Sequence, residues 1–340
     1  MIAIKSIVLT LWITATMGSR VPAGSWYVTR PQLPFQTLVQ CGRTVSATGD
    51  SHIHVIDPER FPMDEDRDYT PKPATVANAT EFQTARGVNH AVIVLPSVYG
   101  TNNSVLVDAL RQFKGKYRGV AVVDPDSVTE EELNELHEAG VRGLRVNLNN
   151  NTDEDIIEEV KKNAAIAKAR NWVVQLWIPL KTYVGLHSII PELGVTFVAD
   201  HFAHAEVGSK TNKTVNTIDP HKSAGFPEVI DLVQRKLLFV KLSAPYQNSK
   251  ATPLYEDMRV VAESLITAGP DMVVYGSDWP HTSSKEGNAA VGGRLNPQEY
   301  RNINDAALVE IVKDWAGSAA QVHRIFVDNP RRLWQWYSEG

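Results

Sequence analysis

From residue 50 onward, short apolar runs alternate with longer amphipathic stretches. Eight of these runs predict β-strands, at residues 51–56, 91–95, 119–123, 143–148, 172–178, 196–199, 237–242 and 272–276. Their spacing is that of repeated strand–helix units, and strands so uniformly apolar suit a parallel sheet that is buried on both faces. The pattern therefore predicts an α/β fold with eight parallel strands.

The stretches between the runs contain residues that typically begin and end α-helices. Thr129 and Glu132 form a capping box, and Gly140 follows where a C-terminal glycine belongs. Further helices are expected at residues 104–113, 305–315 and 319–326, the last of them ending at Asn329-Pro330.

Eight such strands can form a closed barrel or a doubly wound open sheet. The open sheet usually carries a glycine-rich phosphate loop after its first strand, whereas residues 57–60 here read Asp-Pro-Glu-Arg. We therefore expect a single (β/α)₈ barrel of the TIM type over residues 50–340. Residues 20–49 are expected to form an irregular N-terminal arm that leads into the barrel.

The first 19 residues admit two interpretations. Lys5 precedes an apolar run at residues 7–17, which is the layout of a short secretory signal, and the alternative is an unstructured extension. The run is too short for a stable membrane span. The localisation stays open between the secretory pathway and the cytoplasm, because the glycosylation triplet at Asn102 follows the second strand, where a glycan would obstruct an active site.

Composition changes this picture little. The chain is 43% hydrophobic and 21% charged, which is typical of a protein with a sizeable core. The net charge is -5 and the sequence has no basic block, so it gives no sign of a positively charged surface that would bind nucleic acid. The single cysteine, Cys41, excludes an internal disulfide. None of these features decides the oligomeric state.

Titratable side chains collect at the predicted carboxyl ends of three strands. The first strand carries His52 and His54, which period-two alternation places on the same side. The sixth strand runs into Asp200 and His201, and Asp278 follows the eighth. Because the carboxyl ends of barrel strands meet at one face, these groups predict an acid–base or metal site.

These motifs, taken in order, resemble the amidohydrolase superfamily. They are His52-x-His54, Asp-His-Phe at residues 200–202, and Gly-Ser-Asp-Trp-Pro-His at residues 276–281. Further similar stretches lie at residues 96–103, 118–125, 140–147, 240–246 and 329–333. Together they indicate the lactonase branch, typified by 2-pyrone-4,6-dicarboxylate lactonase and D-galactarolactone isomerase, over about residues 50–335.

The resemblance implies a hydrolase that opens a small lactone. It makes Asp278 the general base on water, while His52, His54 and His201 polarise the carbonyl. Physical chemistry agrees, since fixed donors beside an oxygen that gains negative charge are each worth about 10²–10³ in rate. A general base adds a factor of roughly 10²–10⁴. The alternatives are a lactone isomerase and a barrel that only binds a small molecule.

The same four residues could hold a single zinc ion, which would make the chain a zinc-dependent decarboxylase or hydrolase. Metal-dependent members of the superfamily generally add a lysine, glutamate or histidine from the fourth or fifth strand. Those strands here offer Arg145 and Asn147, and Gln175 and Trp177. We therefore expect a metal-independent enzyme without a cofactor. Lys241, at the end of the seventh strand, either steadies a carboxylate, orients Asp278 or forms a structural ion pair.

Polar and aromatic residues near the strand ends are expected to contact the substrate. They are Tyr69, Ser97, Tyr99, Thr101, Asn103, Arg145, Gln175, Tyr246, Gln247 and His281. Dicarboxylate-binding members of the family use arginines, which match carboxylates in a bidentate manner, at two positions where this chain has His204 and Gln247. The resemblance therefore implies a small lactone partner with fewer carboxylates, neutral or monoanionic and of aromatic character.

Overall fold

The computed structural model describes residues 48–149, 151–210 and 219–336. The predictions for residues 1–19 and 20–47 lie outside the described residues. Among the described helices, none combines the length and the apolar character that a membrane span requires.

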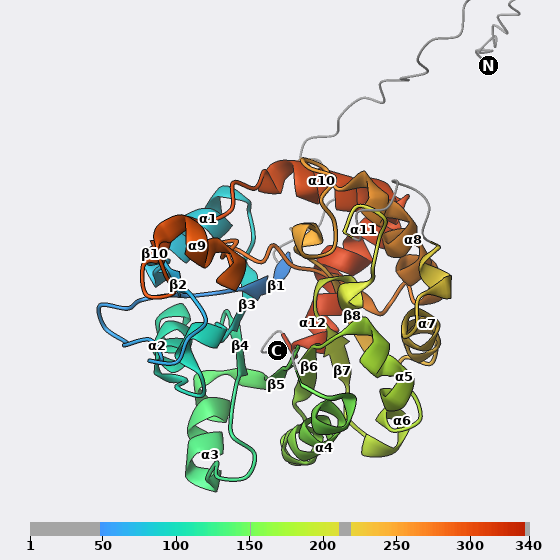
Figure 1. The fold of residues 1–340 in the computed structure, drawn as a ribbon. Helices are drawn as coiled ribbons and strands as arrows, with labels where there is room; N and C mark the ends of the chain where they lie inside the picture. The colour runs from blue at the N-terminus through green and yellow to red at the C-terminus, as the bar shows by residue number, and fades with distance from the viewer. Residues whose placement is uncertain (1–47, 150, 211–218, 337–340) are drawn as a thin grey trace, which may run out of the picture. The chain divides into compact units, whose positions relative to one another are not determined.

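Eight parallel strands stand side by side in the order β1-β3-β4-β5-β6-β7-β8-β9. They are β1 (Gly49–Ile53), β3 (His90–Val94), β4 (Arg118–Ala121), β5 (Val141–Asn147), β6 (Val173–Trp177), β7 (Phe197–Ala199), β8 (Leu238–Leu242) and β9 (Val273–Tyr275). The ring closes where Ile53 pairs in parallel with Trp279, just past β9. The predicted TIM-type barrel is confirmed, and Figure 1 shows the strands encircled by helices.

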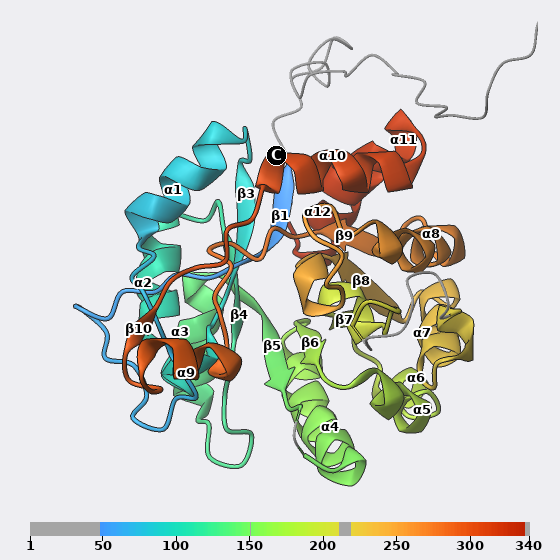
Figure 2. The same ribbon diagram turned by 45° about the horizontal axis from the view of Figure 1, so that its top comes forward.

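Helices cover the outside of the strands in both views (Figures 1 and 2). They are α1 (Val76–Ala85), α2 (Ser104–Phe113), α3 (Glu130–Ala139), α4 (Asp153–Ala169), α5 (Tyr183–Leu186), α6 (Ile190–Leu193), α7 (Phe226–Gln234), α8 (Arg259–Ala268), α9 (Asn288–Val291), α10 (Asp305–Ala316), α11 (Ala319–His323) and α12 (Asn329–Leu333). The predicted capping box of Thr129 and Glu132 opens α3, and Gly140 ends it in a left-handed conformation.

Two segments far apart in sequence pair on one side of the barrel. Strand β2 (Thr70–Pro71) lies parallel to β10 (Pro297–Gln298). In Figure 2 this pair and the neighbouring α9 lie on the same side of the molecule as α2 and α3. The chain before α1 and the chain after β9 are thereby held together.

Most strand ends differ from the expected ones by one or two residues, and two boundaries differ by more. The first strand ends at Ile53 instead of residue 56, because Ile56 pairs antiparallel with Ala74, outside the barrel sheet, through two backbone hydrogen bonds of 2.8 Å. The last predicted helix does not end at Asn329-Pro330, since Pro330 lies in the first turn of α12. A proline is tolerated there, where no helical partner for its missing N–H is needed.

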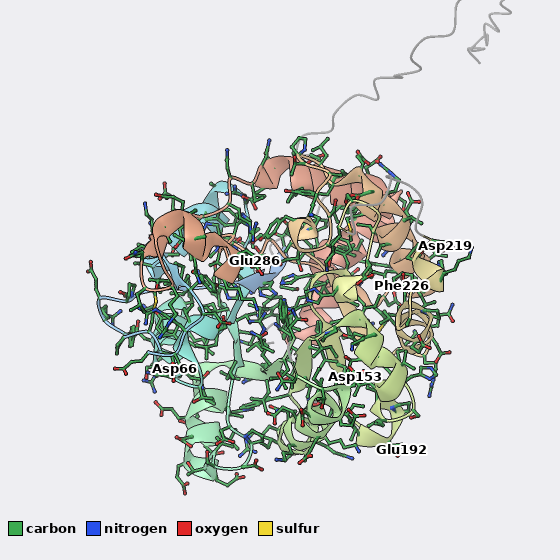
Figure 3. The ribbon with its side chains drawn as sticks, in the orientation of Figure 1. Asp66, Asp153, Glu192, Asp219, Phe226 and Glu286 are labelled. Atoms are coloured by element: carbon green, nitrogen blue, oxygen red, sulfur yellow. The ribbon has the colours of Figure 1, made fainter. Side chains whose placement is uncertain are left out.

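The interior follows the apolar pattern of the sequence. The strand side chains Val92, Val120, Leu144 and Val174 are each 0% exposed. Charged side chains such as Asp66, Glu192 and Asp219 lie on the outer rim (Figure 3). The exceptions are His52, Asp200, Lys241 and a few others, which are polar and yet as buried as the core. Because buried ionisable groups are rare unless they are paired, these exceptions locate the candidate site.

Candidate active site

Asp278 lies at the centre of the predicted histidine cluster. Its Oδ1 is 3.5 Å from His52 Nε2 and 3.5 Å from His54 Nε2. Its Oδ2 accepts a hydrogen bond of 2.6 Å from the Tyr246 hydroxyl. The Asp278 side chain is only 6% exposed. Burial raises the pKa of Asp278, but the nearby histidines outweigh burial and hold the pKa well below its usual range.

The turn that carries Asp278 is fixed by an aspartate on β1. Asp50 accepts bonds from the Ser277 amide at 2.9 Å and the Ser277 hydroxyl at 2.6 Å. Gln83 donates to the same carboxylate over 2.9 Å. Gly276 is required by space, since a Cβ there would lie 2.9 Å from the Cβ of His52. The sequence did not predict that Asp50 holds the turn of Asp278, although Asp50 lies two residues before His52.

His201 approaches from a strained turn after β7. Its ring centroid lies 4.9 Å from that of His52, and its Nδ1 is 2.8 Å from the Ser243 hydroxyl. Residues 201–204 all adopt left-handed backbone conformations, with φ from 46° to 56°. Such conformations cost about 1–3 kcal/mol each and persist where the surroundings impose them. Asn248 contributes by donating to the His201 carbonyl over 2.6 Å.

A buried charge network lies behind His52. Asp200 Oδ2 accepts from Gln175 at 2.9 Å and from Arg145 at 3.3 Å. Its Oδ1 is 3.2 Å from the Lys241 ammonium and 3.3 Å from His52 Nδ1. Burial raises the pKa of Asp200, but Lys241 and the other partners hold it well below its usual range. Burial also lowers the pKa of Lys241 to about 8.

The charges of the cluster nearly cancel. Asp200 and Asp278 are carboxylates, while Arg145 and Lys241 are cations on the same network. Burial lowers the pKa of His52 well below its usual value, so that ring is neutral near pH 7. Two negative and two positive charges therefore form a compact, balanced set, which is the condition for burying them at moderate cost.

The hydrogen positions on His54 follow from its neighbours. Its Nδ1 lies 2.8 Å from the Val94 carbonyl, which can only accept, so Nδ1 carries a hydrogen. A neutral His54 ring then presents the lone pair of Nε2 to the Asp278 carboxylate. Two acceptors at 3.5 Å attract each other only through a hydrogen or a cation between them. A hydrogen or a cation between His54 Nε2 and Asp278 Oδ1 would stabilise this approach.

Two groups of residues could hold a metal ion. They are His52, Asp200 and His201, and His52, His54 and Asp278, with ligand atoms within 4.8 Å of one another in each group. Imidazole nitrogens and carboxylate oxygens suit zinc, and the bond from His54 to Val94 is one that metal-bound histidines often make. The donor chemistry of the second group thus fits one zinc ion, which would polarise a carbonyl as a Lewis acid.

Four of the predicted substrate-binding residues belong to this cluster. Arg145 and Gln175 bind Asp200, while Tyr246 and His281 extend from Asp278. Arg142, on the same strand as Arg145, turns outward and donates to the His137 carbonyl over 3.0 Å. Arg142 and Arg145 therefore lie on opposite sides of β5, as the alternation of side chains along a strand predicts.

Apart from Tyr69, the remaining predicted contacts have their partners outside the cluster. Burial raises the pKa of Tyr69, and the charges of Asp278 and Arg145 also act on it, so this residue lies near the cluster. Tyr69 donates to the Thr282 hydroxyl over 3.1 Å, and Ser97 and Thr101 are exposed. Tyr99 is 1% exposed, and its hydroxyl accepts the Asp57 amide hydrogen at 2.9 Å. Asn103 donates to the Val122 carbonyl over 2.8 Å, and together with Thr101 it lines a separate surface cavity of about 590 Å³. Gln247 is half-buried in the turn after β8.

The acid–base groups converge at the carboxyl ends of the barrel strands. Enzymes with this fold carry their active sites there, so the protein belongs to the class of barrel enzymes. The amidohydrolase family profile matches residues 50–336, and the chain belongs to this family. The predicted resemblance to its lactonase branch is confirmed by relatives over most of the chain.

One relative is the 4-sulfomuconolactone hydrolase of Hydrogenophaga intermedia, 28% identical over 294 residues, or 86% of this chain and 89% of that protein. Another is the 2-pyrone-4,6-dicarboxylate hydrolase of Comamonas testosteroni, 29% identical over 303 residues, or 85% of this chain and 90% of that protein. A solved structure from Acinetobacter baumannii, described as a probable 2-pyrone-4,6-dicarboxylic acid hydrolase with citric acid bound, has a TM-score of 0.66. At 22% identity, covering 85% of this chain and 99% of that one, it supports the fold alone.

Proposed function

We propose that this protein is a hydrolase that opens a small lactone. The observation that carries the proposal is the Asp278 carboxylate, which faces His52 and His54 through one oxygen and is anchored to Tyr246 through the other. A carboxylate held ionised in a buried site is available as a base. Both hydrolase relatives act on lactones by name, which supports the same reaction class for this chain.

In the proposed reaction, Asp278 takes a proton from water as the water oxygen attacks the lactone carbonyl carbon. Charge then develops on the carbonyl oxygen, and donors from the histidine group stabilise it. The Nδ1 of His54 is already bound to the Val94 carbonyl, so only its Nε2 is left to face the substrate. When the ring C–O bond breaks, the leaving oxygen receives a proton from Asp278.

We propose that the reaction needs no metal. Asp200 and Asp278 are already balanced by Arg145 and Lys241, so that a divalent cation would add two uncompensated charges to a buried cluster. The Lys241 ammonium, 3.3 Å from His52 Nδ1, adds repulsion toward any cation bound at the far side of that ring. A proton on His54 satisfies the contact with Asp278 while adding one charge instead of two.

We propose a substrate with fewer carboxylates than a pyrone dicarboxylate. Arg145 is occupied by Asp200, and Gln247 is uncharged. His204 lies beside Trp177, with ring centroids 4.9 Å apart, and its Nε2 is buried without a partner among the described residues. Burial lowers the pKa of His204 well below its usual value, so it offers a neutral contact. A neutral or monoanionic lactone with a planar ring suits these surroundings.

The proposal is tested with a panel of neutral, monoanionic and dianionic lactones and with metal analysis of the purified protein. We expect turnover by the metal-free protein and a loss of roughly 10²–10⁴ in kcat for Asp278→Asn with the fold intact. If no lactone is opened, the proposal fails. One tightly held zinc per chain, lost together with activity, would instead support the zinc-dependent alternative, for which His52, His54 and Asp278 offer ligand atoms within 4.8 Å of one another.

A further inference from the structure

An arginine approaches the candidate site from outside the barrel strands. Arg301 lies in the chain that runs from β10 to α10. Its guanidinium carbon is 5.3 Å from the centroid of the Tyr246 ring, whose hydroxyl donates to Asp278 over 2.6 Å. One tyrosine side chain therefore separates this cation from the proposed base. The sequence does not single out Arg301, because it directly follows no barrel strand and belongs to no motif of the site.

Three contacts hold Arg301 against the turn that carries Asp278. Its backbone amide donates to the His281 carbonyl over 2.9 Å, and its Nε donates to the Thr282 carbonyl over 3.2 Å. The third contact is with the face of the Tyr246 ring, which attracts a cation. A free arginine side chain samples many rotamers and loses that freedom when it binds a ligand. Because these contacts already restrict the side chain, the guanidinium is preorganised for binding.

The contacts leave the outer edge of the guanidinium open. Among the residues that the structure describes, neither terminal nitrogen of Arg301 donates a hydrogen bond, and no carboxylate oxygen lies within 4.0 Å of the guanidinium nitrogens. The Ser284 hydroxyl and, to a smaller extent, Arg301 lower the pKa of Glu286, yet that carboxylate binds Ser284 instead of the arginine. Figure 3 labels Glu286. Arg301 is half-buried, so a ligand can reach the open edge.

From this geometry we infer that Arg301 binds a carboxylate of the substrate and thereby decides which lactones the site accepts. The two N–H groups at the outer edge of a guanidinium match the two oxygens of a carboxylate. The inference rests on the proposed lactone hydrolysis, and it narrows the substrate to lactones that carry one carboxylate. That carboxylate lies on the Arg301 side of Tyr246, and the lactone carbonyl lies on the Asp278 side. Arg301 takes no part in proton transfer.

The charges around the site favour a single carboxylate at this position. Arg145 and Lys241 are already paired with Asp200, so they are not available to a substrate anion. Asp278 repels a carboxylate that lies next to it, because both groups are negative. Arg301 attracts the carboxylate to the far side of the tyrosine ring, where that ring keeps the two negative groups apart. The position of the cation therefore orients the lactone as well as binding it.

Steady-state kinetics on a matched pair of lactones tests the inference. One lactone carries a carboxylate, and the other carries a carboxamide at the same position, which has a similar shape without the charge. Arg301→Gln should lower kcat/KM for the carboxylated lactone by about tenfold to a hundredfold, because a charge-assisted contact is lost. The loss should appear mainly in KM, since the contact forms equally with the substrate and the transition state. The carboxamide should change by less than about threefold.

Two further variants control this experiment. Arg301→Lys keeps the charge without the paired N–H groups, so it should show an intermediate loss and guards against a folding defect in the glutamine variant. Arg235→Gln removes an exposed arginine that pairs with Asp231, and it should leave both lactones unaffected. An equal loss on both lactones in the Arg301 variants would overturn the inference, and so would an unchanged kcat/KM for the carboxylated one.

A binding measurement does not depend on turnover. Isothermal titration calorimetry with benzoate should show binding to the wild type and a dissociation constant about tenfold or more higher for Arg301→Gln. Benzamide, which is uncharged, should not distinguish the two proteins. Benzoate that binds both proteins alike, or that does not bind the wild type, would refute the carboxylate site. Benzoate binding that depends on Arg301, together with no turnover of any lactone, would refute only the proposed function.

Discussion

The replacement of Lys241 by methionine tests the buried charge balance behind His52. The Lys241 ammonium is 0% exposed, donates to Gln175 over 2.6 Å and lies 3.2 Å from Asp200. Methionine fills similar space without charge, so Asp200 keeps only Arg145 as a cationic partner. Removal of one member of a buried ion pair costs about 3–5 kcal/mol, and we expect the lower end because Arg145 remains.

This free energy converts into a measurable change of melting temperature. Unfolding entropy of about 2.1 cal/mol/K per residue over the 280 residues that the structure describes gives about 0.6 kcal/mol/K, so a loss of about 3 kcal/mol lowers Tm by about 5 °C. Differential scanning calorimetry at neutral pH measures the change. Lys236→Met is the control, since that lysine is 69% exposed and lies 3.6 Å from Asp271, and its Tm should change by about 1 °C or less. A Tm for Lys241→Met within 1 °C of the wild type would refute the charge balance.

Three further predictions concern pH, packing and substrate choice. Burial lowers the pKa of Lys241 to about 8, so kcat/KM should fall as pH rises through that value, and a profile that stays flat to about pH 10 would contradict a role for the ammonium. Unfolded lysine keeps its proton to about pH 10.4, so the free energy of unfolding should rise between about pH 8 and 10.4, and circular dichroism should show that the lost activity is not unfolding. The neutral Lys241 amine still donates to Gln175 and Asp200, whereas methionine donates to neither, so loss of the proton does not have the destabilising effect of Lys241→Met. Gly276→Ala should destabilise the fold by about 1–3 kcal/mol and lower kcat by pressing on His52, and an unchanged denaturation midpoint would argue against this. His204→Arg should raise kcat/KM for a carboxylated lactone relative to its neutral counterpart by about tenfold, and an unchanged ratio would place the substrate elsewhere.

The fold was largely predictable because the barrel strands are buried on both faces. Each apolar run contains or overlaps one observed strand, since continuous burial leaves a continuous apolar signal. Boundaries were less predictable where tertiary contacts decide them. The first strand ends at Ile53 because Ile56 pairs with Ala74, outside the barrel sheet. Residues 329–333 form a helix because Pro330 falls where its ring is tolerated.

The residues of the candidate cluster were predictable from the sequence, but the hydrogen bonds that hold them were not. His52, His54, His201 and Asp278 follow strand ends, and parallel strands must bring those ends together. The hydrogen-bond partners have no local signature, since Asp50 and Ser277 are 227 residues apart. The bond from His54 to the Val94 backbone is equally invisible, because any residue type offers a carbonyl. The roles of these groups stay predictions until activity is measured.

Lactone opening in water labelled with oxygen-18 tests the central claim most directly. If Asp278 activates a water molecule, mass spectrometry should find one labelled oxygen in the product carboxylate after a single turnover by the metal-free protein. Asp278→Asn should form this product about 10²–10⁴ times more slowly. A rearranged lactone without label would show an isomerase instead of a hydrolase. Labelled product formed equally fast by Asp278→Asn would contradict the assignment of Asp278 as the base.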